Sequence, residues 1–212
     1  MGALNTYITQ CRRLLHDANG AFWPDAELTD YINEARNRVA QDTKCLRRVV
    51  TSLTLPSGQE TYTPQSFIPT YGPRLVDVMG ISIYINNTRI KLQYYAYTQF
   101  DALMRYWVNY QQWPVAFSRV GATIIYVGPV PNQDYVSDWD VAVNPAALAS
   151  DSDPEEIPVP FTDVIKFWAC YLAKFKEQSL GECQIYKNEY AKNVLMASRS
   201  FQTRIIPNPY AR

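Results

Sequence analysis

Apolar residues recur at helical spacing near both ends of the chain. The pattern predicts helices over residues 3–16, 25–43, 162–178 and 182–201, each with apolar positions three or four residues apart. Pro24, followed by an acidic residue, marks the start of the second helix. Because each pair of helices is short for an independent bundle, we expect all four to pack together.

Between residues 49 and 145 the pattern changes to that of strands. Residues 49–64 read as two strands joined by a tight turn, PSGQ, and a second hairpin is expected at Asn86 and Asn87, which tolerate positive φ. A short helix is expected over 98–107, followed by three more strands. The predicted fold class is α+β: a four-helix bundle, made of two N-terminal and two C-terminal helices, with an inserted, mostly antiparallel β domain.

The domain organisation follows from these segments. We expect an N-terminal helical hairpin (1–48), the inserted β-rich domain (49–145), an acidic, proline-rich connector (146–161), a C-terminal helical hairpin (162–201) and an extended C-terminal arm (202–212).

Composition narrows the possible functions. The 20 basic and 20 acidic residues cancel, which argues against general binding to nucleic acid or to a membrane surface. Cys11, Cys45, Cys170 and Cys183 are widely spaced without a CxxC pair, so we expect buried reduced thiols rather than disulfides or a zinc site. The first residues lack an apolar signal core, and no apolar run approaches the roughly 18 residues of a membrane span, so synthesis in the cytosol is expected.

The charges are unevenly distributed along the chain. Residues 129–163 hold eight acidic residues and no Lys or Arg, whereas residues 164–212 hold eight basic residues against three acidic ones. These charges either lie on solvated faces or meet between copies of the chain, since ring assemblies use unlike faces. The candidates for an intersubunit acidic segment are Asp151, Asp153, Glu155 and Glu156.

A search for catalytic motifs finds none. The sequence contains no GxSxG, HExxH, GxxxxGK[ST] or GxGxxG motif. The only histidine, His16, is expected to cap the first helix, where the helix C-terminus favours a cation. A pair with Cys11 is sterically possible, but nothing nearby suggests an oxyanion site. We therefore predict that the protein is not an enzyme and has no catalytic residue.

Two ligands, calcium and DNA, have candidate residues in the sequence. The carboxylates of DSDPEE (151–156) could bind calcium, but the glycine and the glutamate spacing of an EF-hand are missing, and a solvated loop is the favoured interpretation. Arginines in CRRLL and CLRRVV could contact DNA, but nearby acidic residues dilute them. No cofactor and no metal are predicted.

The C-terminal segment RSFQTRIIPNPYAR (199–212) is apolar, basic and punctuated by prolines. Prolines favour an extended form, which loses less entropy on docking, so this arm is the predicted partner-binding site. The alternative is a tail folded back on the β domain. The candidate contact residues are Arg199, Phe201, Arg204, Ile205, Ile206, Pro207, Pro209 and Tyr210.

Four segments together resemble the head-to-tail adaptor (connector) proteins of tailed bacteriophages, and the similarity spans about residues 5–210. The β region is larger than in the mostly helical adaptors of some short-tailed phages. The segments are WPDAELTDYINEARNRVAQDT (23–43), IIYVGPVPNQDY (124–135), DSDPEEIPVPFTDVIKFWACYLAKFKEQ (151–178) and IIPNPY (205–210).

The resemblance implies a structural protein of the virion neck, assembled in the host cytoplasm. Such adaptors form a dodecameric homo-oligomeric ring beneath the portal, extend the channel for DNA ejection and support the tail. The implied partners are other copies of the chain, the portal protein, a tail tube or nozzle protein, and double-stranded DNA that passes without specific binding; no membrane is involved. The arm is implied to reach the portal. The alternatives are another neck or tail ring, such as a head-completion or tail-terminator protein, or a tail-associated hydrolase.

Overall fold

The computed structural model describes residues 2–105, 110–121 and 123–201. Internal contacts divide the chain into two compact units: a helical unit, formed by Met1–Leu46 together with Pro145–Arg212, and a β unit, formed by Arg47–Asn144. Helices and antiparallel sheets are both present, which confirms the α+β class.

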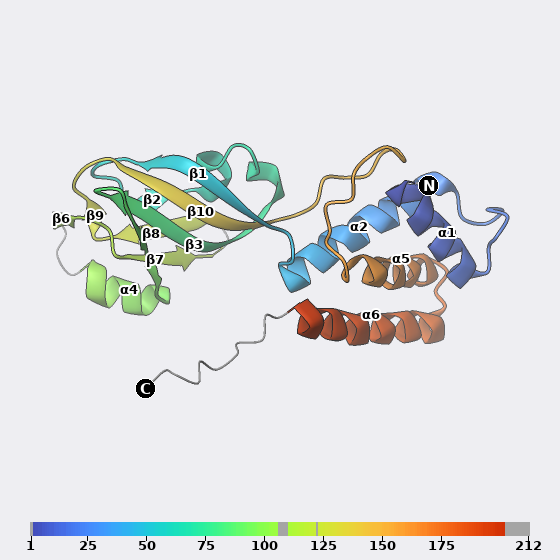
Figure 1. The fold of residues 1–212 in the computed structure, drawn as a ribbon. Coiled ribbons are helices and arrows are strands. Elements are labelled where there is room, and N and C mark those ends of the chain that lie inside the picture. Colours follow the sequence, from blue (N-terminus) through green and yellow to red (C-terminus); the bar gives the residue numbers. More distant parts are fainter. Residues whose placement is uncertain (1, 106–109, 122, 202–212) are drawn as a thin grey trace, which may run out of the picture. The chain divides into compact units, whose positions relative to one another are not determined.

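The helical unit contains α1 (Ala3–Leu15), α2 (Asp25–Thr43), α5 (Thr162–Lys176) and α6 (Leu180–Phe201). These bounds agree closely with the helices predicted from periodicity. Figure 1 shows α5 between α2 and α6, so segments from opposite ends of the chain lie side by side. All four helices contribute to one hydrophobic cluster, whose buried members include Cys11, Ile32, Val39, Ala169 and Tyr190.

The larger sheet of the β unit is antiparallel and has the strand order β1-β10-β3-β4. Its strands are β1 (Arg47–Leu55), β10 (Tyr135–Val143), β3 (Leu75–Ile85) and β4 (Thr88–Lys91). The predicted hairpin at Asn86 and Asn87 is confirmed: it joins β3 to β4, and the two asparagines have φ values of 48° and 61°.

A second sheet has the order β2-β8-β7-β5, and β6 pairs separately with β9. The pairs β5–β7 and β6–β9 are parallel, so the β unit is mostly but not wholly antiparallel. The remaining elements are β2 (Thr61–Tyr62), α3 (Pro64–Phe67), η1 (Gly72–Arg74), β5 (Gln93–Tyr94), α4 (Tyr97–Met104), β6 (Gln111–Gln112), β7 (Ala116–Val120), β8 (Ile124–Gly128) and β9 (Val130–Pro131).

The hairpin predicted over residues 49–64 is wrong. β1 pairs with β10, and β2 pairs with β8, so the two strands flanking PSGQ belong to different sheets. The physical reason is that β1 lies along the nine-residue strand β10, which carries the largest fully buried side chain of the described residues, Trp139. This long pairing outweighs the local turn signal, which carries no information about distant strands.

Trp139 organises the aromatic core of the β unit. Its ring centroid lies 5.1 Å from that of Phe67 in α3 and 6.2 Å from that of Tyr62 in β2. The indole N–H donates to Ser137 Oγ at 3.0 Å, so this large side chain is buried without leaving its polar atom unpaired. Burial of such a ring provides apolar area and edge-to-face contacts that smaller side chains cannot supply.

Replacing Trp139 by alanine is therefore expected to lower the free energy of unfolding of the β unit by about 3–5 kcal/mol, the usual cost of removing a buried aromatic ring. Urea denaturation followed by far-UV circular dichroism measures this change. Val136→Ala on the same strand is the matched control, because Val136 is 48% exposed, and it should alter stability by less than about 0.5 kcal/mol. Equal effects of the two substitutions would contradict the assignment of the core.

Candidate functional site

The acidic connector is bound to the helical unit through its carboxylates. Asp151 accepts hydrogen bonds from the backbone N–H groups of Gly2 at 2.8 Å and Asn5 at 2.9 Å, at the N-terminus of α1. Asp153 accepts from Ala149 and Ser150, both at 2.7 Å, and closes its own turn. A carboxylate placed at a helix N-terminus satisfies free N–H groups and complements the helix dipole.

These hydrogen bonds lower the pKa of both aspartates. For Asp151 the main cause is the N–H of Asn5, followed by that of Gly2. For Asp153 the main cause is the N–H of Ser150, followed by that of Ala149. Both groups therefore favour the charged form more strongly than a free aspartate does.

A buried ion pair joins the connector to α2. The Arg36 side chain is almost fully buried, and its guanidinium donates to both oxygens of Glu155, with Nη2–Oε1 at 2.8 Å and Nε–Oε2 at 3.1 Å. Arg36 also donates to the carbonyl oxygen of Ala146 at 2.6 Å and to Asn33 Oδ1 at 3.2 Å. Each of the three guanidinium nitrogens thus has at least one acceptor, which lowers the cost of burying the charge.

The solvated-loop interpretation of the acidic cluster is therefore incomplete. Each of the four proposed intersubunit carboxylates has a partner within the chain; Glu156 accepts from the N–H of Ala146 at 2.6 Å. Their role between subunits stays a prediction. Arg36 is not among the site residues predicted from the sequence. The sequence does contain a signal for it, since this arginine interrupts the apolar face of α2 formed by Leu28, Ile32, Ala35 and Val39.

An apolar groove of about 590 Å³ lies in the helical unit between α2 and α6, with Trp168 of α5 among its lining residues. Arg38 donates to Asp42 at 2.9 Å and lies over the Trp168 ring, 5.0 Å from its centroid. The Tyr190 hydroxyl also donates to Asp42 at 2.9 Å, and burial is the main cause that raises the pKa of Tyr190. The other lining residues are Lys187, Ala191, Val194, Leu195 and Ser198.

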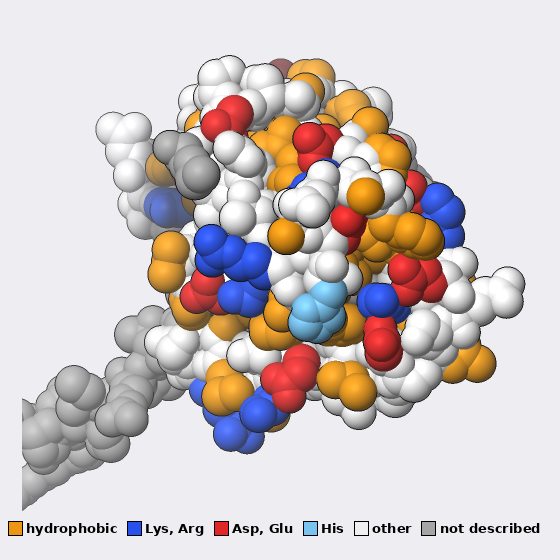
Figure 2. Space-filling model, turned by 90° about the vertical axis from the view of Figure 1, so that its right-hand side faces the viewer, with side chains coloured by type: hydrophobic (Ala, Val, Ile, Leu, Met, Phe, Trp, Pro, Cys, Tyr) orange, Lys and Arg blue, Asp and Glu red, His pale blue; other side chains and the backbone are white. Residues whose placement is uncertain are grey.

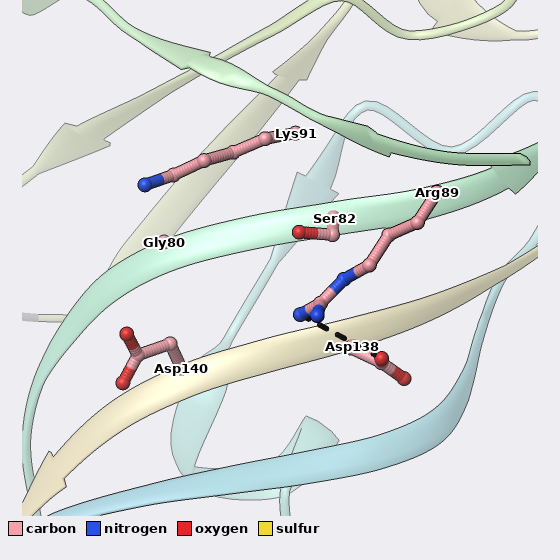
Figure 3. A pocket seen from close by; sticks show the side chains of 6 residues that line it. All are labelled: Gly80, Ser82, Arg89, Lys91, Asp138 and Asp140. Carbon is pink, nitrogen blue, oxygen red and sulfur yellow. Dashed lines mark ion pairs between the residues drawn. The ribbon is translucent and has the colours of Figure 1, made fainter.

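A polar hollow of about 350 Å³ lies on the larger sheet of the β unit. Figure 3 shows Arg89 reaching from β4 toward Asp138 of β10, with 3.8 Å between Nη2 and Oδ2. Asp138 also accepts from the Tyr84 hydroxyl at 2.6 Å, and Asp140 is paired with Arg47. Lys91 has no ion-pair partner among the described residues. The lining residues carry both signs of charge and include no paired nucleophile and base.

Cys11 and His16, whose pairing is sterically possible from the sequence but not predicted, do not form a pair. His16 ends α1 in the left-handed conformation, with φ 58°, and Figure 2 shows its side chain, in pale blue, on the surface. Cys11 is buried on the core side of α1, where the Cys170 thiol lies 3.9 Å from its carbonyl oxygen. All four cysteines are free, and three of them are buried.

The whole predicted C-terminal arm, residues 202–212, lies outside the described residues. Arg199 and Phe201 belong to α6, so the helix includes the first two candidate contact residues. Arg199 is exposed. Whether the arm binds a partner stays a prediction.

Neither a metal site nor a membrane-spanning helix is found among the described residues. Within that part of the chain, no group of three or more His, Cys, Asp or Glu side chains is arranged to hold a metal ion. None of the helices found there has the length and apolar character needed to cross a membrane.

Comparison with known proteins gives one family assignment. The family model described as SU10 adaptor protein matches residues 4–205, which covers both units. A search of curated proteins gives no match.

Replacing Glu155 by alanine is expected to lower the free energy of unfolding of the helical unit by about 3–5 kcal/mol, because it leaves the Arg36 charge buried and unpaired. Thermal or urea unfolding measures the change. Glu189→Ala is the control: Glu189 faces Lys192 at 3.8 Å on the exposed side of α6, and its loss should cost less than about 1 kcal/mol. Similar losses for the two variants would show that the buried pair does not hold the connector.

The depressed aspartate pKa values predict acid sensitivity. A carboxyl whose pKa is lower in the folded state stabilises the fold above its unfolded pKa of about 3.9, and this contribution is lost as the pH falls through the lower, folded value. We expect stability to fall below about pH 4 and Asp151→Asn to make that fall shallower while reducing stability at neutral pH. Urea unfolding across this pH range tests the claim, and an unchanged slope in Asp151→Asn would contradict it.

Proposed function

Because the chain belongs to the SU10 adaptor protein family, we propose that it forms a ring between the portal and the tail of a bacteriophage. The family supports a structural adaptor of the phage virion, in which binding and assembly, rather than catalysis, are the task. The match over residues 4–205 is the observation that carries this proposal, since it includes all the described helices and sheets.

The helical unit supports a role in assembly. Its four helices act, in this proposal, as a bundle that carries the contacts between neighbouring subunits. The shared hydrophobic cluster gives the helices a fixed arrangement, and the groove of about 590 Å³ leaves an apolar surface beside them uncovered within the described chain. Apolar grooves lined by helices are common docking sites for partner segments.

The charge balance is compatible with a DNA channel. The 20 basic and 20 acidic residues give no net charge, and affinity for DNA depends mainly on how many phosphates a protein neutralises. A ring of such subunits would let double-stranded DNA pass without holding it. We propose that the ring is dodecameric, extends the portal channel and provides the attachment platform for the tail, after assembly in the host cytoplasm.

The C-terminal arm is the proposed contact with the portal. Its apolar and basic residues can fill pockets and pair with acidic groups, and its prolines reduce the entropy lost on docking. Repetition around the ring then turns a weak contact into a strong one, because each further arm binds at a high effective concentration.

Replacing residues 202–212 by a Gly–Ser segment of the same length tests this assignment, because the change begins after the last helical residue, Phe201. Binding to purified portal rings of the same phage is measured by biolayer interferometry. We expect affinity to fall about tenfold or more, since avidity multiplies the loss of each arm.

The thermal unfolding midpoint is the control, and it should not change. Equal affinity of the two proteins would overturn the arm assignment but leave the adaptor proposal intact. If the unaltered protein binds neither the portal nor itself, the adaptor proposal is wrong, and a tail-associated hydrolase becomes the better interpretation. Rings that form without binding the portal would instead favour a tail-terminator ring.

A further inference from the structure

Two unpaired carboxylates lie one turn apart on the exposed side of α2. Asp30 and Glu34 are both exposed, and neither has a hydrogen bond or ion pair among the residues that the structure describes. They differ from Asp25 and Glu27 in the same helix, which pair with Arg12 and Lys176. Like charges at positions i and i+4 repel each other on a helix, so a cation supplied by another copy would relieve this repulsion.

A complementary row of side chains lies on α6. Lys187, Ala191, Leu195 and Arg199 follow one another at intervals of four residues and therefore form one ridge of the helix. Lys187 and Arg199, at its two ends, have no ion-pair partner within the described part of the chain. The middle of the ridge is small and apolar, and Leu195 is 52% exposed.

This ridge forms one wall of the groove between α2 and α6. Lys187, Ala191 and Leu195 all line it, beside Trp168. Asp30 and Glu34 are not among the lining residues, and they follow each other along α2 on the side away from its buried residues Leu28 and Ile32. One helical unit therefore carries an acidic ridge and a basic, apolar-centred ridge on different surfaces.

We propose that these two surfaces meet between neighbouring copies of the chain, with the N-terminal half of α2 from one copy docked against the α6 ridge of the next. This interface rests on the proposed ring, whose contacts it specifies. Unlike surfaces that meet head to tail generate a ring when the rotation between neighbouring copies closes.

The spacing of the residues fits this contact. Ala26 and Glu34 are eight residues apart, as are Ala191 and Arg199, and Leu195 and Lys187. At 1.5 Å per residue each pair spans about 12 Å along its helix. Seating Ala26 of one copy against Ala191 of the other brings Glu34 to Arg199, and seating it against Leu195 with the helices antiparallel brings Glu34 to Lys187. In both registers Asp30 lies one turn before the paired carboxylate, beside the small or apolar centre of the ridge.

The exposed apolar group at the start of α2 fits the groove. Phe22 is 66% exposed and lies two residues before Pro24, which precedes the first turn of α2. Acidic and basic side chains are interspersed among hydrophobic ones on the face of the molecule seen in Figure 2. Phe22 supplies an apolar contact for the groove walls, and the pairing of Glu34 with a cation fixes the register.

Charge reversal tests the interface. The variants Asp30→Lys/Glu34→Lys and Lys187→Glu/Arg199→Glu should each assemble about tenfold more weakly than the unaltered protein, because each places like charges opposite each other. Assembly is measured by mass photometry, with the protein alone and on purified portal rings. The variant with all four reversals should recover assembly, as should a mixture of the two doubly reversed proteins, whose unlike surfaces match alternately around an even-numbered ring.

Arg13→Glu is the matched control, since Arg13 is an exposed cation on α1 with no ion pair among the described residues, and it should assemble normally. Circular dichroism checks that every variant is folded. Normal assembly of the two doubly reversed variants, or failure of the four-residue variant to recover, would overturn the interface while leaving the adaptor function in place. Absence of assembly by the unaltered protein, alone and on portal rings, would overturn the adaptor function itself.

Discussion

The buried ion pair between Arg36 and Glu155 is the interaction on which the helical unit depends. This unit is built from two stretches of chain that are far apart in sequence, Met1–Leu46 and Pro145–Arg212. Arg36 binds Glu155 and the carbonyl oxygen of Ala146, so it fixes the returning chain against α2 before α5 begins. Asp151 then caps α1 from the same connector. Because removing one partner of a buried ion pair leaves an uncompensated charge, we expect this contact to favour the observed path of the connector.

The sequence predicts those parts of the fold that depend on local pattern. The helices over 3–16 and 25–43 follow from apolar spacing, and the turn at Asn86 and Asn87 follows from residues that accept positive φ. The pairing of β1 with β10 could not be predicted in this way, because the partners are separated by 80 to 95 residues and a turn signal between β1 and β2 points elsewhere.

In the candidate site, too, local patterns are visible in the sequence, whereas contacts between distant residues are not. The acidic run at 151–156 is visible in the sequence, but its hydrogen-bond partners, Gly2, Asn5 and Arg36, come from the other end of the chain. The groove likewise arises only when α2, α5 and α6 are together. The division of charge between acidic and basic segments suggested contacts between copies. The connector's carboxylates have partners within the chain, and their role between copies stays a prediction. The interface that we propose uses Asp30 and Glu34 on α2 instead.

The account as a whole describes a protein whose chemistry is that of assembly: a helical unit with unlike surfaces, a neutral overall charge and a C-terminal arm proposed to reach a partner. A cryo-electron-microscopy reconstruction of the neck of the phage that encodes this chain tests its central claim most directly. The account predicts a ring of copies of this fold coaxial with the portal and between it and the tail. Density for this fold at another position in the virion, or its absence from the virion, would contradict the account.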